Sequence, residues 1–177
     1  MSAIEALRGR IPDFAKDLKL NLQTVLGESS LNDAQKWGVA VAAAAATGHD
    51  ELQTAVLEDA KTHTIDAVIE DARAAAALMA MNNVFYRFRH FMSEGSDDYA
   101  KLPAKLRMNA LANPGVDKAD FELWSLAVSA INGCGMCIES HEHEVRKHGV
   151  TAEQVQAVVR IASVVNAVAA VKRAEAV

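Results

Sequence analysis

The chain has 177 residues, of which 51% are apolar, so it can bury a full core as one compact domain, residues 1–177, without structural crosslinks. Its net charge is −5 and its basic residues are scattered, which excludes the concentrated positive face that nucleic acid or an anionic membrane requires. Two cysteines spaced Cys-x-x-Cys are too few for a disulfide scaffold and indicate redox work or metal binding.

The N-terminal segment, MSAIEALRGRIPD, has neither the uninterrupted apolar stretch nor the small-residue cleavage pattern of a signal peptide. No later run reaches the roughly 18 to 20 apolar residues of a membrane span, because the Ala-rich stretch after Trp37 ends at Thr47. We therefore expect a soluble, cytoplasmic protein with neither a membrane nor a nucleic acid as its partner.

Helix-forming residues dominate the chain, and its apolar side chains recur with a period typical of helices. In chain order, helices are predicted to begin near Asp13, Asn32, Thr64, Ala100 and Lys118. The third runs to about Phe91, and Asn113-Pro114-Gly115 is a stop before the fifth. After the start signal at Thr151, one stripe of a last amphipathic helix carries Val155, Val158, Ala162, Val165 and Ala169. The predicted fold class is all-α.

The chain also contains an internal repeat at a separation of 87 residues. The matched pairs include Trp37 with Trp124, Val39 with Leu126, Ala40 with Ala127 and Thr64 with Thr151. We predict that the halves 31–92 and 118–177 are two copies of one helical unit. The reactive residues of the second half have other counterparts in the first: Cys134 pairs with Thr47, Cys137 with Asp50 and Glu122 with Gln35. The unit therefore does not require its cysteines in order to fold.

The chemistry is predicted to lie between Phe121 and His143. Asn132-Gly133 ends one helix, and Cys134 opens the next, which continues through Cys137 and His141. Positions i and i+3 of a helix share a face, so the two sulfurs can come within bonding distance. The unpaired N–H groups at a helix N-terminus stabilise a thiolate and lower the pKa of its thiol. His141, one turn after Cys137, is the natural base.

Glu122 lies in the first turn of the preceding helix and reaches the cysteines only if the two helices cross back on one another. A zinc site is an alternative, because Cys134, Cys137, His141 and His143 are four potential ligands. His141 and His143 are two residues apart on a helix and point in different directions, so we predict no metal. Two inert buried thiols are a further alternative.

These residues resemble the signature of a known family. In the alkyl hydroperoxidase D (AhpD) proteins, within the wider carboxymuconolactone decarboxylase-like superfamily, a Glu is followed after eleven residues by Cys-x-x-Cys, and after three more by His. Glu122, Cys134, Cys137 and His141 reproduce that spacing unchanged. The resemblance covers nearly the whole chain and runs through FAKDLKLNL, MNNVFYRFRHF, LRMNALANPG and FELWSLAVSAINGC.

The resemblance implies an AhpD-like fold and an antioxidant alkyl hydroperoxide reductase. Cys137 would attack the peroxide and become a sulfenic acid, while Cys134 would donate a proton and then close the disulfide. Glu122 and His141 would form the relay that deprotonates Cys137. No cofactor would be bound, since a dihydrolipoyl group on a dehydrogenase subunit supplies the electrons. The dithiol would also reduce the peroxiredoxin AhpC through a mixed disulfide at Cys134, and the protein would be a homotrimer.

One departure from the family concerns the residue before Cys137. Some close members carry a histidine there, whereas this chain has Met136, which cannot move protons. Either Glu122 and His141 suffice, or His143 substitutes. Two other functions remain open: a decarboxylase-type enzyme of the wider superfamily, which needs no redox dithiol, and a non-catalytic, redox-sensing helical oligomer whose disulfide forms without turnover.

Overall fold

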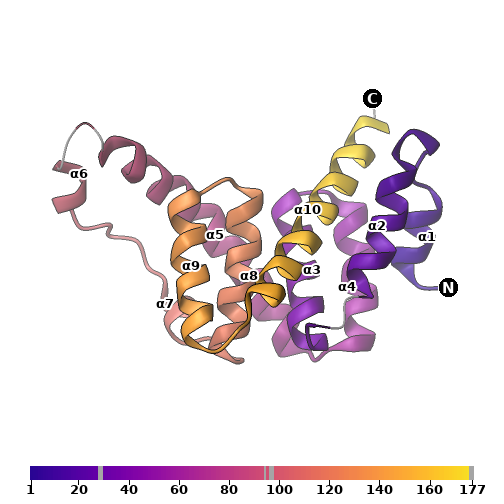
Figure 1. Ribbon diagram of the computed structural model, residues 1–177, viewed down its shortest axis with the longest axis horizontal. Helices are drawn as coiled ribbons and strands as arrows, with labels where there is room; N and C mark the ends of the chain where they lie inside the picture. The colour runs from indigo at the N-terminus through magenta and orange to yellow at the C-terminus, as the bar shows by residue number, and fades with distance from the viewer. Residues whose placement is uncertain (28–29, 94, 96–97, 176–177) are drawn as a thin grey trace.

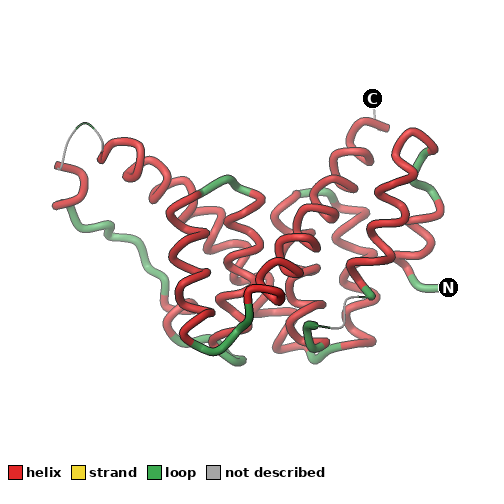
Figure 2. The backbone as a smooth tube through the Cα atoms, viewed as in Figure 1, coloured by secondary structure: helices red, strands yellow, loops and turns green. Residues whose placement is uncertain are grey.

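A computed structural model describes residues 1–27, 30–93, 95 and 98–175. Within these ranges the regular structure is helical and contains no strand, which confirms the predicted all-α class (Figure 2). The elements are α1 (Ala3–Gly9), a short 3-10 helix (Asp13–Ala15), α2 (Lys16–Leu26), α3 (Asp33–Thr47), α4 (Asp50–His63), α5 (Asp66–Ser93), α6 (Asp98–Lys101), α7 (Asn109–Ala112), α8 (Lys118–Ile131), α9 (Gly135–Lys147) and α10 (Ala152–Glu175).

Capping residues set the starts of the long helices. Asn32 and Gln35 form a capping box at the start of α3, in which each side chain bonds the other's backbone N–H. Thr151 and Gln154 bond in the same reciprocal way at the start of α10. The predicted starts near Asn32, at Lys118 and after Thr151 are therefore confirmed.

The centre of the molecule is formed by α3 and α8, which pack on each other and on both α5 and α10. Their buried stretches are Trp37–Ala44 and Phe121–Ser129. The two helices approach most closely at Gly38, where a Cβ would overlap the Trp124 indole. Trp124 Nε1 also donates to the backbone oxygen of Gln35 at 3.3 Å. Both tryptophans are buried in the core.

The helix predicted to begin near Ala100 is wrong in extent. α6 ends at Lys101, and the chain then runs without helix to Asn109, as the loop between α6 and α7 shows (Figure 2). Pro103 is the physical reason, because proline lacks an N–H and disfavours helical backbone in the residue before it. The stop at Asn113-Pro114-Gly115 is confirmed by the end of α7 at Ala112. Asp71 of α5 holds this stop, since its Oδ2 accepts from Gly115 N at 2.7 Å.

α10 has the length and composition of a membrane-spanning helix, with a window of mean hydropathy 1.5, although it contains no uninterrupted apolar run of that length. Its contacts are those of a core helix. One face packs against α2, α3 and α8, and the buried residues on it are Ala157, Val158, Ile161, Ala162, Val165, Val168 and Ala169. Burial of this face accounts for part of the apolar character of α10, since 39% of the window is buried within the fold.

The helices of the two halves begin at separations near, but not equal to, the 87 residues of the predicted repeat. α3, α4 and α5 begin at residues 33, 50 and 66, and α8, α9 and α10 begin 85, 85 and 86 residues later, at 118, 135 and 152. In each half the first helix packs on the other two. The equivalence of the halves stays a prediction, and so does the single domain of residues 1–177.

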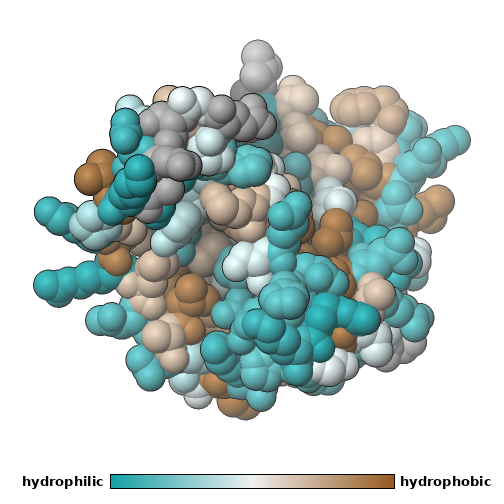
Figure 3. All heavy atoms as spheres, turned by 60° about the vertical axis from the view of Figure 1, so that its left-hand side comes forward, coloured by the Kyte–Doolittle hydropathy of each residue, from teal (hydrophilic) through white to brown (hydrophobic). Residues whose placement is uncertain are grey.

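The end of α5 extends away from the body of the molecule toward α6 (Figure 1). Val84, Phe88 and Phe91, spaced four and three residues apart on one side of this helix, have exposed fractions of 61%, 46% and 68%. Tyr99 meets Phe88 edge to face, with ring centroids 5.1 Å apart. Figure 3 shows the molecule rotated so that the side with this end of α5 comes forward, and on this face apolar side chains lie in patches among polar ones.

Candidate functional site

The two cysteines form a disulfide at the start of α9. Gly133, in left-handed conformation with φ 66°, turns the chain out of α8, and Cys134 N donates to Ser129 O across that turn at 3.1 Å. Cys134 is the cap residue of α9, and Cys137 lies in the first turn, with the two Cα atoms 5.2 Å apart. The predicted i, i+3 arrangement is confirmed, except that Cys134 precedes the first helical residue.

The two sulfur positions differ in exposure. Cys134 is fully buried, whereas Cys137 retains 7% exposure and lines a cavity. A small molecule that enters this cavity therefore meets Cys137. The first turn of α9 supplies backbone N–H groups that have no partner within the helix, and these favour negative charge on a reduced Cys137.

Glu122 and His141 are in direct contact between α8 and α9. Glu122 Oε2 lies 2.6 Å from His141 Nδ1, and the two residues are 6% and 7% exposed. The contact exists because α9 folds back along α8 after the Gly133 turn, which brings the start of α8 to the middle of α9. The carboxylate can therefore fix the orientation and tautomer of the imidazole. His143 is exposed, in agreement with its predicted separation from His141.

Met79 completes the surroundings of His141. Its Sδ lies 3.2 Å from His141 Nε2 and also accepts from Asn83 Nδ2 at 3.9 Å. Met79 is buried like a core residue, and its position against the imidazole also makes it part of the site. Only the tertiary contact between α5 and α9 reveals this role.

The cavity beside Cys137 has a volume of about 330 Å³. It lies among α5, α7, α9 and the segment before α7, and its lining residues are Met79, Asn82, Tyr86, Met108, Leu111, Met136, Cys137, Ser140 and His141. Three thioethers, a leucine and a tyrosine make most of this wall apolar and polarisable. Met136, the departure from the family pattern, thus contributes a wall to the cavity.

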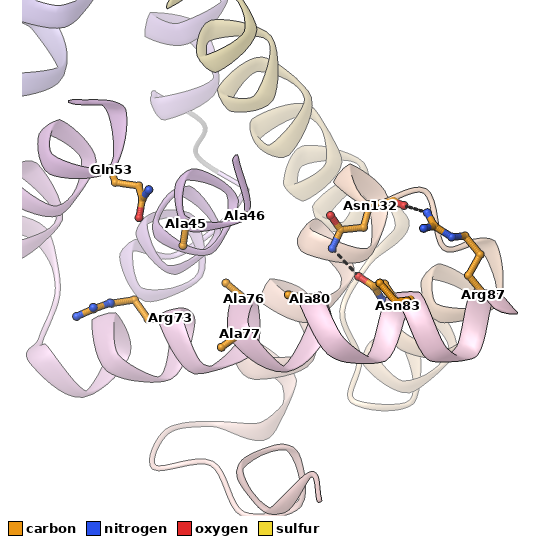
Figure 4. A pocket seen from close by; sticks show the side chains of 11 residues that line it. Ala45, Ala46, Gln53, Arg73, Ala76, Ala77, Ala80, Asn83, Arg87 and Asn132 are labelled. Carbon is orange, nitrogen blue, oxygen red and sulfur yellow. Dashed lines mark hydrogen bonds between the residues drawn. The ribbon is translucent and has the colours of Figure 1, made fainter. Parts of the chain in front are cut away.

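A larger hollow of about 480 Å³ lies elsewhere, between the end of α3, α4 and α5 (Figure 4). Alanines form most of its floor, and neither cysteine lines it. At one end Asn132 Nδ2 donates to Asn83 Oδ1 at 2.9 Å, and Arg87 donates to Asn132 O at 2.7 Å (Figure 4). Arg87 thus holds the turn that leads into Cys134.

The chain is similar to known proteins over nearly its whole length. The profile of the carboxymuconolactone decarboxylase family matches residues 97–177, which include all four residues of the signature. A protein of Maricaulis maris named alkyl hydroperoxide reductase AhpD is 58% identical over 98% of this chain and 99% of its own length. Proteins of the same name from Rhodospirillum centenum and Brucella suis are 55% and 51% identical, covering 98% and 94% of this chain and 92% and 94% of their own.

Proposed function

The chain belongs to the AhpD family of alkyl hydroperoxide reductases, within the carboxymuconolactone decarboxylase family, and from this membership we propose that it reduces organic hydroperoxides through the dithiol of Cys134 and Cys137. One observation carries the proposal. The Cys134–Cys137 disulfide closes at the start of a helix, where Cys137 opens into an apolar cavity that His141 also lines. A reactive thiol, a base and a space for an apolar substrate therefore meet at one place.

The reaction begins with the reduced dithiol. His141, oriented by Glu122, takes the proton of Cys137, and the thiolate attacks the terminal oxygen of the hydroperoxide. The O–O bond breaks, Cys137 becomes a sulfenic acid, and the alkoxide leaves with the proton of Cys134 as an alcohol. The Cys134 thiolate then attacks the Cys137 sulfur. Hydroxide leaves and takes the proton held by His141, so that dithiol and hydroperoxide give disulfide, alcohol and water.

The electrons that reopen the disulfide come, in this proposal, from a dihydrolipoyl group carried on a dehydrogenase subunit. No bound cofactor is needed, because a dithiol reduces a disulfide directly by exchange. The same dithiol reduces the peroxiredoxin AhpC through a mixed disulfide at Cys134. That step requires the turn before α9 to open, since Cys134 is fully buried. We further propose a homotrimer located in the cytoplasm.

The proposal is tested with reduced protein and cumene hydroperoxide. Cys137→Ser is expected to abolish hydroperoxide consumption. The matched variant, Cys134→Ser, is expected to consume one equivalent and to stop at a sulfenic acid that a dimedone-type reagent traps. Added dihydrolipoamide should restore many turnovers to the wild type alone. Normal consumption by Cys137→Ser would refute the proposal, and a wild type that stops after one equivalent despite excess dihydrolipoamide would indicate a redox sensor.

A further inference from the structure

Met79 contacts the second ring nitrogen of His141. Its Sδ lies 3.2 Å from Nε2, whereas Nδ1 lies 2.6 Å from Glu122 Oε2, so both ring nitrogens have a partner in the disulfide form. A thioether sulfur accepts hydrogen bonds and has no hydrogen to donate. The contact therefore requires a hydrogen on Nε2, which His141 donates to Met79.

The position of this sulfur is set by the packing of α5. Met79 is 1% exposed, and its Sδ also accepts from Asn83 Nδ2, one turn along the helix, at 3.9 Å. Asn83 is itself held to α8 and to the turn before α9. It donates to Ser129 Oγ and accepts from Asn132 Nδ2, both at 2.9 Å (Figure 4). The acceptor offered to His141 therefore lies on a braced helix that carries neither cysteine.

The redox state of Cys137 changes what competes with Met79 for Nε2. Cys137 lies four residues before His141 on α9 and lines the same cavity. In the disulfide its sulfur is neutral, and among the described residues Nε2 contacts Met79 and not Cys137. After reduction, a Cys137 thiolate is a charged acceptor, and charge-assisted hydrogen bonds are about twice as strong as neutral ones. The thiolate is therefore the better partner for Nε2–H.

We propose that Met79 is a positioning residue that holds His141 Nε2 while the disulfide is closed and yields it to Cys137 when the disulfide is reduced. This inference rests on the proposed function, in which His141 is the base of Cys137. Because Met79 bonds Nε2 only in the disulfide form, it stabilises that form relative to the dithiol.

The protons and electrons of the cycle balance. A reducing dithiol becomes its own disulfide and gives up two electrons and two protons. One proton goes to Cys134 and the other to solvent, and Cys137 stays a thiolate that accepts from Nε2–H. In the reaction with hydroperoxide, the alkoxide takes the proton of Cys134 and the hydroxide takes that of His141. Solvent then returns one proton to Nε2, which restores the contact with Met79.

The test is the redox equilibrium of Met79→Leu. Leucine has a similar volume and no acceptor, so the disulfide form loses one hydrogen bond and the dithiol form loses none. In equilibrium with mixtures of reduced and oxidised dithiothreitol, the constant is expected to move about tenfold toward the dithiol, which corresponds to about 1.4 kcal/mol. Met81→Leu is the matched control, because Met81 lies on the same helix but does not line the cavity, and it should keep the wild-type constant.

Nitrogen NMR of the imidazole tests the exchange of partner directly. In the oxidised wild type, Nε2 of His141 should carry a hydrogen, and its resonance should shift on reduction and in oxidised Met79→Leu. If Met79 only fills the core, both redox forms of Met79→Leu lose the same stability and the equilibrium does not move. That result, or a bare Nε2 in the oxidised wild type, would overturn the inference and leave the proposed function intact, since neither measurement uses hydroperoxide. A wild type that consumes no hydroperoxide would instead refute the proposed function.

Discussion

From the contact between Glu122 and His141 we predict how far the variant Glu122→Gln lowers the rate of reaction with hydroperoxide. The carboxylate oxygen and the ring nitrogen are 2.6 Å apart, and both residues are more than nine-tenths buried, so solvent screens the interaction little. Glutamine keeps an oxygen that accepts from Nδ1–H, and therefore preserves the orientation of the ring. It removes the negative charge that stabilises the imidazolium formed when His141 takes the Cys137 proton.

The expected loss follows from the contribution of a positioned proton acceptor. General base catalysis is worth about 10²- to 10⁴-fold in rate, or roughly 3 to 5 kcal/mol of activation free energy. We expect Glu122→Gln to lower the second-order rate constant of reduced protein with cumene hydroperoxide at neutral pH by about 10²-fold, the lower end of that range, because the ring remains in place. Stopped-flow mixing under excess peroxide measures this rate constant.

The pH dependence separates a relay from a structural effect. Above about pH 8.5, the ordinary pKa of a cysteine, the thiolate forms without a base, so the deficit of Glu122→Gln should shrink. Asp120→Asn is the control. It removes a carboxylate from the same helix, but this carboxylate bonds Gln35 and not His141. A wild-type rate in Glu122→Gln at neutral pH would refute the relay. So would a deficit of the same size at both pH values.

Three further predictions follow from the packing, the charges and the surface. Gly38→Ala is expected to lower the free energy of unfolding by about 1 to 2 kcal/mol in urea titrations, because overlap with Trp124 outweighs the better helix propensity of alanine. Gly9→Ala is the control and should be neutral, because no atom lies within 4 Å of the added Cβ. Burial raises the pKa of Asp120 above its ordinary value of 3.8. The wild type therefore loses stability as the pH rises above that value and the buried carboxyl ionises, and Asp120→Asn should gain stability relative to wild type over the same rise in pH, measured by chemical unfolding. Phe91→Asp should reduce the mass measured by light scattering, because the exposed apolar side of α5 is expected to lie in a subunit contact, and an unchanged mass would exclude that contact.

The sequence predicts most of the fold because its signals are local. Asn32 with Gln35, and Thr151 with Gln154, are capping pairs that short-range hydrogen bonds realise in the structure. α1 and α4 are additional to the predicted helices. The start of α4 uses His49, whose Nδ1 accepts from Leu52 N at 3.3 Å, and histidine is not among the residues that usually mark a helix start.

The same distinction between local signals and tertiary contacts applies to the site. The spacing of Cys134, Cys137 and His141 lies within α9 and its cap, and helix geometry alone predicts their common location. The contact with Glu122 depends on how α8 and α9 pack, and the sequence provides it only through the family resemblance. Asn82 and Met108 come together from α5 and the irregular segment before α7, a meeting that no periodicity in the chain encodes.

If the two halves are copies of one unit, as the sequence predicts, the first half is a unit that folds without the reactive groups. At the repeat offset Gln35 takes the place of Glu122, and its side chain donates to Asp120 at 2.9 Å while its backbone oxygen accepts from Trp124. Gln35 thus joins α3 to α8 through Nε2 and its backbone oxygen, while its Oε1 caps the start of α3. Glu122 instead directs its carboxylate to His141, on a neighbouring helix that carries the chemistry.

The two sulfurs are buried to different extents, so they are accessible to different reaction partners. A small hydroperoxide or dithiol that enters the cavity meets Cys137, because Cys134 has no exposed surface. The turn that covers Cys134 is held by Arg87 on Asn132 and by the bond from Cys134 N to Ser129 O. A protein partner that bonds to Cys134 must open these contacts first, because they cover Cys134 in the disulfide form, in which the two Cα atoms are 5.2 Å apart.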